Sequence, residues 1–258
     1  MPVFDRIIGI DYSGAKTPTE SLEPLRVFAS DNLAVPVEIA PPPSPRRYWT
    51  RRGVAEWLVD QLTDGPRTLV GIDHGFSFPL RYFEAHRLEP DWPTFLDDFQ
   101  RHWPTDGAHV YVDFVRDGHV GNGAERGGNA RWRRITEERA SAKSVFHFDV
   151  PGQVAKSTHA GIPWLRFMRQ KLAGKVDFWP FDGWKLSGRS VVAEVYPSLW
   201  SRGFASKDRT PDQHDAYSIA EWLRRADLSG EVAALFDPAL SPHERAAADV
   251  EGWILGVG

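Results

Sequence analysis

Near its N-terminus the chain reads RIIGIDYSGA over residues 6–15. The bulky apolar residues in this stretch are typical of a buried strand, and the strand passes directly into Asp11. A second apolar run, TLVGID over residues 68–73, ends in Asp73, and a third, SVVAEV over residues 190–195, carries Glu194. The sequence therefore predicts three buried strands, each of which brings one acid to its end or close to it.

The segments between these runs predict an α/β fold. Residues 25–30 and 33–39 are short β-rich runs around Asp31 and Asn32, which indicates a hairpin, and Pro36 favours an edge position for its second strand. We expect a single domain over residues 1–258, in which residues 90–189 form a large insertion. Helices are expected from the N-cap Thr50 to about residue 62 and over residues 92–102, 162–172, 211–226 and 242–255.

The composition excludes several classes of protein. The 258 residues are 41% hydrophobic and 26% charged, which argues against extensive disorder. The chain contains no cysteine, which excludes a disulfide scaffold, an iron–sulfur cluster, a thiolate zinc site and a cysteine nucleophile. We expect neither a signal peptide nor a membrane span, and therefore a cytoplasmic protein. The net charge of −4 means that nucleic acid would have to bind a local basic patch.

The positions of the three strand acids predict a common site. In a sheet of parallel strands, ligands bind beyond the carboxyl ends of the strands, where Asp11 and Asp73 would lie. A single Asp at such a position more often opens a turn or caps a backbone amide. Glu194 differs because it lies within an apolar run, and a half-buried carboxylate is costly unless it is paired or binds a cation.

Asp215 is the fourth candidate. It lies four residues before Ile219, which belongs to the apolar face of the helix expected over residues 211–226, so Asp215 borders the core. Asp212 lies one turn earlier, in the first turn, where the helix dipole explains an acid. We therefore predict a site of four carboxylates: Asp11, Asp73, Glu194 and Asp215.

Such a site requires cations. Four neighbouring carboxylates repel one another and stay ionised together only when positive charge neutralises them. Oxygen ligands in a chain without cysteine suit Mg²⁺ or Mn²⁺. Two such ions about 4 Å apart activate a water molecule and stabilise the leaving oxygen in phosphodiester cleavage.

Five short motifs, taken in order, resemble the domain of unknown function 429 family. The resemblance covers nearly the whole chain and is weakest over residues 90–180. It implies a ribonuclease-H-like fold, with a mixed five-stranded sheet and helices on both faces, and the activity of a predicted nuclease. Asp11, Asp73, Glu194 and Asp215 match the acidic positions of the family. The motifs are IIGIDYSGA at 7–15, GIDHGFSFP at 71–79, AEVYP at 193–197, HDAYSIA at 214–220 and EGWI at 251–254.

Two features depart from the family or extend it. Asp73 is followed by His74 and Gly75, where many relatives are expected to have a small residue and a proline, and this indicates a reshaped loop. The insertion is rich in Trp and Arg, and we expect it to set the substrate. Its segment FWPFDGW at 178–184 is interpreted as an aromatic plug that packs on the sheet.

Weaker candidates surround the four acids. Lys156, Ser157 and His159 precede the helix expected at residue 162 and suggest an anion site, although an ordinary polar loop has the same pattern. His74 and His214 each neighbour a proposed ligand and are expected to orient a carboxylate. RWRR at 131–134 either grips phosphates or lies on a solvated helix face.

We therefore expect a hydrolase: a metal-dependent, nuclease-like phosphodiesterase with nucleic acid as a candidate substrate. Two alternatives stay open. In an actin-like, ATP-dependent phosphotransferase, residues 11–16 and 73–75 would be phosphate loops, but a glycine-rich adenosine motif and a second copy of the core are missing. A non-catalytic protein would use the acids to bind one structural ion or a basic segment of a partner.

Overall fold

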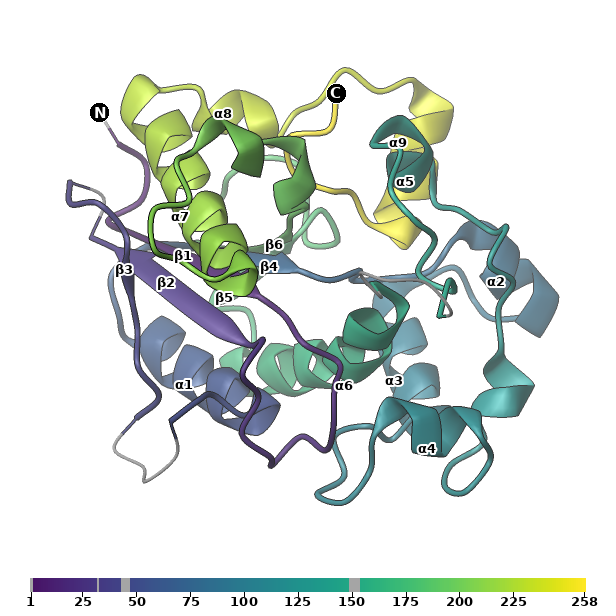
Figure 1. The fold of residues 1–258 in the computed structure, drawn as a ribbon. Coiled ribbons are helices and arrows are strands. Elements are labelled where there is room, and N and C mark those ends of the chain that lie inside the picture. Colours follow the sequence, from purple (N-terminus) through teal and green to yellow (C-terminus); the bar gives the residue numbers. More distant parts are fainter. Residues whose placement is uncertain (1, 32, 43–46, 149–153) are drawn as a thin grey trace.

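The computed structural model describes residues 2–31, 33–42, 47–148 and 154–258, so Asn32 in the predicted hairpin turn lies outside the described residues. At its centre is a mixed sheet with the strand order β3-β2-β1-β4-β6-β5 (Figure 1). β1, β4, β6 and β5 run parallel, whereas β2 is antiparallel to both β1 and β3. The strands are β1 (Arg6–Asp11), β2 (Arg26–Ser30), β3 (Val37–Glu38), β4 (Thr68–Asp73), β5 (Val176–Trp179) and β6 (Ser190–Glu194).

The α/β class and the mixed sheet are confirmed, but the described sheet has six strands and not the expected five. The additional strand is β5, whose last two residues, Phe178 and Trp179, were interpreted as part of an aromatic plug. Both side chains are buried, on opposite faces of the sheet. A strand of four residues is too short to show a clear apolar period, and β5 is fixed by its parallel pairing with β6.

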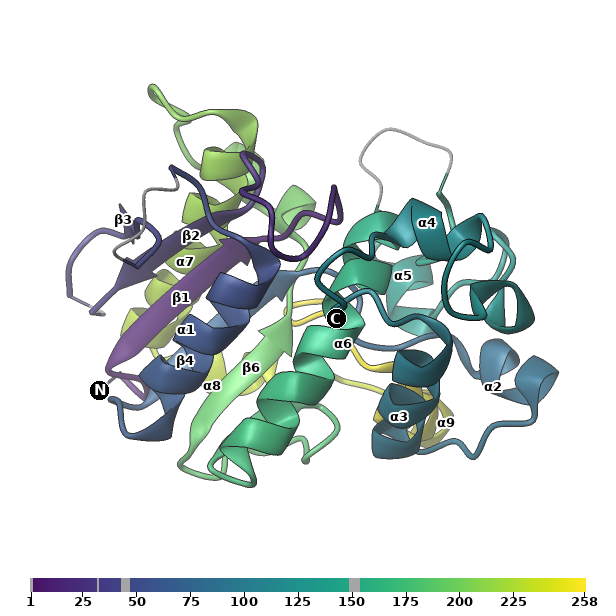
Figure 2. The ribbon, with the colours of Figure 1, turned by 90° about the horizontal axis from the view of Figure 1, so that it is seen from below.

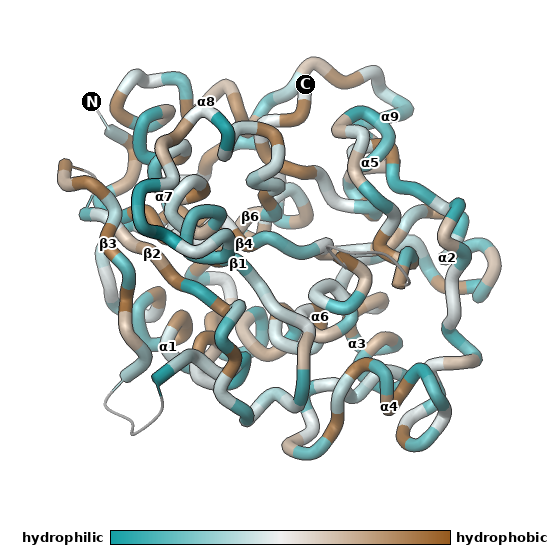
Figure 3. The backbone as a smooth tube through the Cα atoms, in the orientation of Figure 1, coloured by the Kyte–Doolittle hydropathy of each residue, from teal (hydrophilic) through white to brown (hydrophobic). Residues whose placement is uncertain are grey.

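Helices cover both faces of the sheet (Figures 1 and 2). α1 (Arg51–Thr63) and α6 (Val154–Leu172) pack together on one face, and α7 (Pro211–Ser229) lies along β1 and β2 on the other. Side chains of β1 alternate between the two layers: Ile8 and Ile10 join the layer of α1, and Ile7 joins the layer of α7. Figure 3 shows hydrophobic residues interspersed with hydrophilic ones along the helices that cover the sheet.

Two strand glycines let α7 approach the sheet closely. A Cβ atom on Gly9 would lie 2.4 Å from the carbonyl oxygen of Ala216, and one on Gly71 would lie 2.7 Å from the side chain of Ile219. The glycines are therefore required where α7 crosses β1 and β4, and this crossing sets the position of Asp215.

The segment expected as an insertion is partly core. It contains α3 (Trp92–His102), which has the predicted bounds, together with α6 and β5, which complete the layers of the sheet. α6 begins at Val154, eight residues before the predicted start, and Pro163 lies inside it. Burial of an almost continuous stretch from Ala155 to Leu165 outweighs the cost of an interior proline.

The remaining helices frame the strand ends. Thr50 caps α1 as predicted, and Thr210 caps α7 with Gln213 in a capping box. α9 ends at Glu251 instead of residue 255, because Gly252 has a φ of +76° and turns the chain back toward β6. The other elements are α2 (Leu80–His86), α4 (Val112–Arg116), α5 (Ile135–Arg139), α8 (Val232–Leu235), α9 (Pro242–Glu251) and three short 3₁₀ turns at 123–126, 197–199 and 201–203.

In the described parts of the chain, none of the helices has both the length and the apolar composition that crossing a membrane requires.

Candidate functional site

A cavity of about 710 Å³ lies at the carboxyl ends of β1, β4 and β6. Asp11 and Asp73 stand at these ends and are direct Cα partners in the parallel pair of β1 and β4. Glu194 ends β6, and Asp215 reaches the cavity from α7. The structure therefore brings all four predicted site residues to one cavity, from four separate elements.

The two strand-end aspartates, Asp11 and Asp73, have raised pKa values because of burial and of neighbouring acids. Burial raises the pKa of Asp11 well above its usual value, and the charges of Asp73, Asp212 and Asp215 raise it further. Burial, followed by the charges of Asp215 and Glu194, likewise raises the pKa of Asp73. Among the described residues, no hydrogen bond is made to either carboxylate. Burial and repulsion therefore favour the protonated form of these two acids, and a cation beside them would favour the ionised form.

α7 contributes two acids and not one. Asp212 also lines the cavity, three residues before Asp215 and so on the same side of the helix. Burial raises the pKa of both side chains, while His214 and a hydrogen bond with Ser201 partly oppose the shift of Asp215. Asp212 had been explained by the helix dipole alone. The spacing of three residues was the signal in the sequence that both would face one site.

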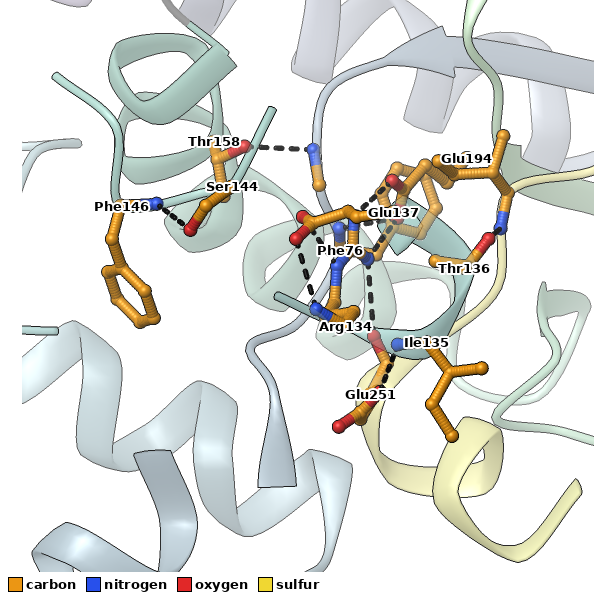
Figure 4. A network of polar contacts seen from close by, with 12 residues as sticks. Phe76, Arg134, Ile135, Thr136, Glu137, Ser144, Phe146, Thr158, Glu194 and Glu251 are labelled. Carbon is orange, nitrogen blue, oxygen red and sulfur yellow. Dashed lines mark hydrogen bonds and ion pairs between the residues drawn. The ribbon is translucent and has the colours of Figure 1, made fainter. Parts of the chain in front are cut away.

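Glu194 differs from the other acids because it forms a buried ion pair with Arg134 (Figure 4). Its two carboxylate oxygens accept hydrogen bonds from Arg134 at 2.6 and 2.7 Å, and one of them also accepts from the backbone N–H of Phe76 at 3.0 Å. The contacts of Glu194 therefore do not support its predicted role as a metal ligand. An ion pair explains its burial.

Arg134 is the centre of a buried network (Figure 4). Its Nε donates to Glu137 at 2.9 Å, and Nη1 donates to the carbonyl oxygen of Glu251 at 3.2 Å. Burial alone disfavours the charged guanidinium, but Glu194 and Glu137 more than offset it and raise the pKa of Arg134. The expected phosphate grip or solvated helix face at 131–134 is thus wrong for Arg134, which ties the insertion to β6 and to the end of α9.

The loop after β1 is held from below by Arg51. This buried side chain of α1 donates from its guanidinium to the carbonyl oxygens of Ser13, Ala15 and Lys16 at 3.2, 2.5 and 2.9 Å. Gly14 packs against α6 so closely that a Cβ atom would lie 2.2 Å from the carbonyl of Lys156. Hydrogen bonds from Arg51 therefore hold this loop, which lines the cavity, and only glycine fits at position 14, where the loop contacts α6.

The histidines do not act as expected. His74 makes its Nδ1 contact with the carbonyl oxygen of Gly75 at 2.9 Å and not with a carboxylate, and burial lowers its pKa to about 4. His214 contacts the carbonyl oxygen of Ser201 through Nε2 and affects Asp215 only by its charge. His159 is buried among aromatic rings, away from the cavity lining, so Lys156 and Ser157 alone of the expected anion site line the cavity.

The donor chemistry of the cavity suits a divalent ion only in part. In the described ranges, no group of three or more His, Asp or Glu side chains is arranged to hold a metal ion. Mg²⁺ is commonly bound by one or two carboxylates, with water and substrate phosphates completing its shell. Asp11 and Asp73 offer two neighbouring carboxylates of this kind, with Asp215 close enough to affect the pKa of both.

No family model, curated protein or solved structure matches the chain. The case for a function therefore rests on the cavity, on its charges and on the sheet that carries them.

Proposed function

We propose that the protein is a metal-dependent, nuclease-like phosphodiesterase of the domain of unknown function 429 family, with a ribonuclease-H-like core. The observation that carries the proposal is the meeting of Asp11, Asp73 and Asp215 at one cavity, where no ion pair to these three acids is seen among the described residues and the charge of Arg26 only partly offsets the raised pKa of Asp11. A site for an ordinary ligand has no need for several half-buried carboxylates so close together, since their mutual repulsion is costly.

The order of elements supports the proposed core. β1 is followed by the hairpin of β2 and β3, by α1 and then by β4, and further helices lead to β6 and α7. This is the order in which the resemblance expects strand, hairpin, helix, strand, helices, strand and helix. β5 extends the sheet at the edge beside β6.

The acidic residues of the cavity would have different roles in metal binding. Asp11 and Asp73 would hold a divalent ion from the strand ends, and Asp215, with Asp212 beside it, would complete the acidic side from α7. When bound, the ion would supply an activated water and neutralise charge on the phosphate. Arg134 pairs with Glu194, so this carboxylate is held in a buried ion pair while its charge still raises the pKa of Asp73. Because Asp11 and Asp73 have raised pKa values, metal must displace protons there, and binding should strengthen as pH rises.

A cleavage and binding experiment tests the proposal. The wild-type protein is incubated with single-stranded, duplex and branched DNA and RNA in Mg²⁺ or Mn²⁺, and its thermal shift with Mn²⁺ is measured in parallel. Asp11→Asn should lose both cleavage and the thermal shift, whereas Asp60→Asn, an exposed change on α1, should keep both.

Two results would contradict it. Absence of cleavage over the whole panel would favour a binding protein, and protection by ATP without cleavage would favour the phosphotransferase. Equal Mn²⁺ shifts in the wild type and in Asp11→Asn would place the metal elsewhere.

A further inference from the structure

The insertion places an exposed aromatic ring in the same cavity. Tyr111 lines the cavity and is 37% exposed. Among the large hydrophobic side chains that are exposed in the described residues, it is the only aromatic one. Most other rings of the insertion are buried in the core, so packing does not explain why this one is presented to the cavity.

The ring of Tyr111 is held in place. It stacks on Phe114 with a centroid distance of 5.2 Å and an interplanar angle of 28°, and Phe114 stacks in turn on His119 at 4.9 Å. Tyr111 immediately precedes α4, and Lys156 of α6 pairs with Asp113 of α4 at 2.6 Å. Figure 2 shows α4 beside the first turns of α6. The ring of Tyr111 is therefore packed against a second ring and does not extend into solvent on its own.

Three lysines lie among the acids that line the same space, and one of them, Lys156, is the partner of Asp113. Lys16, Lys143 and Lys156 all line the cavity and come from the loop after β1, the loop after α5 and the first turn of α6. Lysine ammonium groups near an aromatic platform are the combination that single-stranded nucleic acid uses, with phosphates on the cations and bases on the ring.

The size of the cavity limits what can enter. A volume of about 710 Å³ lies within the range of sites for small molecules, roughly 300–1,000 Å³. One or two nucleotide units fit such a space, whereas a base-paired helix does not. Asp11 and Asp73 are half-buried at the strand ends and line this cavity, so a phosphate that reaches them has to enter the cavity, which an unpaired strand can do more readily than a duplex.

We propose that the cavity binds single-stranded nucleic acid, with an unpaired base stacked on Tyr111 and neighbouring phosphates placed between the three lysines and the strand-end aspartates. The proposal names the substrate of the proposed function and rests on that function for the fate of the phosphate. The binding step itself needs no cleavage, so the two can be tested apart.

The test is binding measured by fluorescence anisotropy, with Ca²⁺ in place of Mg²⁺. The labelled ligands are a single-stranded oligothymidylate, a strand of equal length without bases, and a duplex. The proteins are the wild type, Tyr111→Ala, Tyr111→Phe and the control Leu228→Ala, a similarly exposed residue of α7 outside the cavity. The melting temperature of each variant is recorded to exclude unfolding.

The wild type should bind the base-bearing strand about tenfold more tightly than the base-free strand, and more tightly than the duplex. Tyr111→Ala should weaken binding of the base-bearing strand about tenfold, about 1.4 kcal/mol, and leave the base-free strand unchanged. Tyr111→Phe keeps the ring and should bind like the wild type, as should Leu228→Ala.

Equal binding of the two strands, tighter binding of the duplex, or no effect of Tyr111→Ala would each overturn the proposal. If cleavage occurs but Tyr111→Ala retains the wild-type KM, the nuclease function stands and the stacking site falls. If the strand binds through Tyr111 but is never cut, the stacking site stands and the nuclease function falls.

Discussion

Two kinds of acid reach the same cavity and differ in what surrounds them. Glu194, at the end of β6, accepts hydrogen bonds on both carboxylate oxygens from Arg134, which belongs to the insertion. Asp11 and Asp73, at the ends of the adjacent parallel strands, meet mainly other acids, and their pKa values are raised. Position at a strand end therefore does not decide the role of an acid. The role depends on whether the protein supplies the compensating charge itself.

The largest effect is expected when the paired acid loses its partner. Arg134→Met leaves Glu194 and Glu137 buried without a cation, and should lower the free energy of unfolding by about 3–5 kcal/mol in urea denaturation. Arg166→Met is the matched control, because its ion pair with Asp97 is at the surface and should contribute less than about 1 kcal/mol. A similar loss in both variants would show that the buried pair is not special.

The next effect concerns the two acids of α7. Asp215→Asn keeps the shape of the side chain and removes its charge, so cleavage should fall about 1,000-fold, equivalent to about 4 kcal/mol, without unfolding the protein. Asp212→Asn should cause a smaller loss, because Asp212 lies nearer to the helix start and to Arg26. Rates are compared in single-turnover assays. Full activity of Asp215→Asn would remove this residue from the site.

A third prediction separates the two kinds of acid by metal binding. A hundredfold excess of Mn²⁺ over its Kd should stabilise the wild type by about 2.7 kcal/mol in a thermal melt. Asp11→Asn should lose this shift and raise the metal-free melting temperature, because one repelling charge is gone. Glu194→Gln should lower stability but keep the Mn²⁺ shift. Loss of the Mn²⁺ shift in Glu194→Gln together with its retention in Asp11→Asn would show that the metal binds Glu194 and not Asp11.

The smallest expected effect is on the pH dependence of the free energy of unfolding, to which Asp11 and Asp73 contribute in one direction and a buried histidine in the other. Burial lowers the pKa of His159 to about 3, so its stability contribution is present above about pH 6.5 and is lost as pH falls below that value. By pH 5 the loss should reach about 2 kcal/mol. The raised pKa values of Asp11 and Asp73 act in the opposite direction, because their protonation favours the folded state.

His159→Leu isolates the histidine contribution. In urea denaturation between pH 7 and 5, the variant should lose less stability than the wild type over this range. Equal pH slopes in the two proteins would show that His159 is not held neutral in the folded state.

Much of the fold could be predicted from local patterns. The apolar runs that end in Asp11 and Asp73 were recognisable because a buried strand needs several consecutive apolar residues. Thr50 and Thr210 marked helix starts because their hydroxyl groups satisfy free backbone N–H groups. β5 and the first turns of α6 escaped prediction because a short edge strand and a helix with an interior proline are stabilised by their neighbours.

The candidate site divides in the same way. The sequence by itself determined which acids stand at strand ends, since that depends only on where each apolar run stops. The ion pair of Glu194 with Arg134, sixty residues earlier, and the meeting of Tyr111 and three lysines at the same cavity follow from the three-dimensional fold alone. Charge compensation is a contact between distant segments. This contact depends on how the insertion folds back onto the sheet, and no local sequence pattern encodes which distant segments meet.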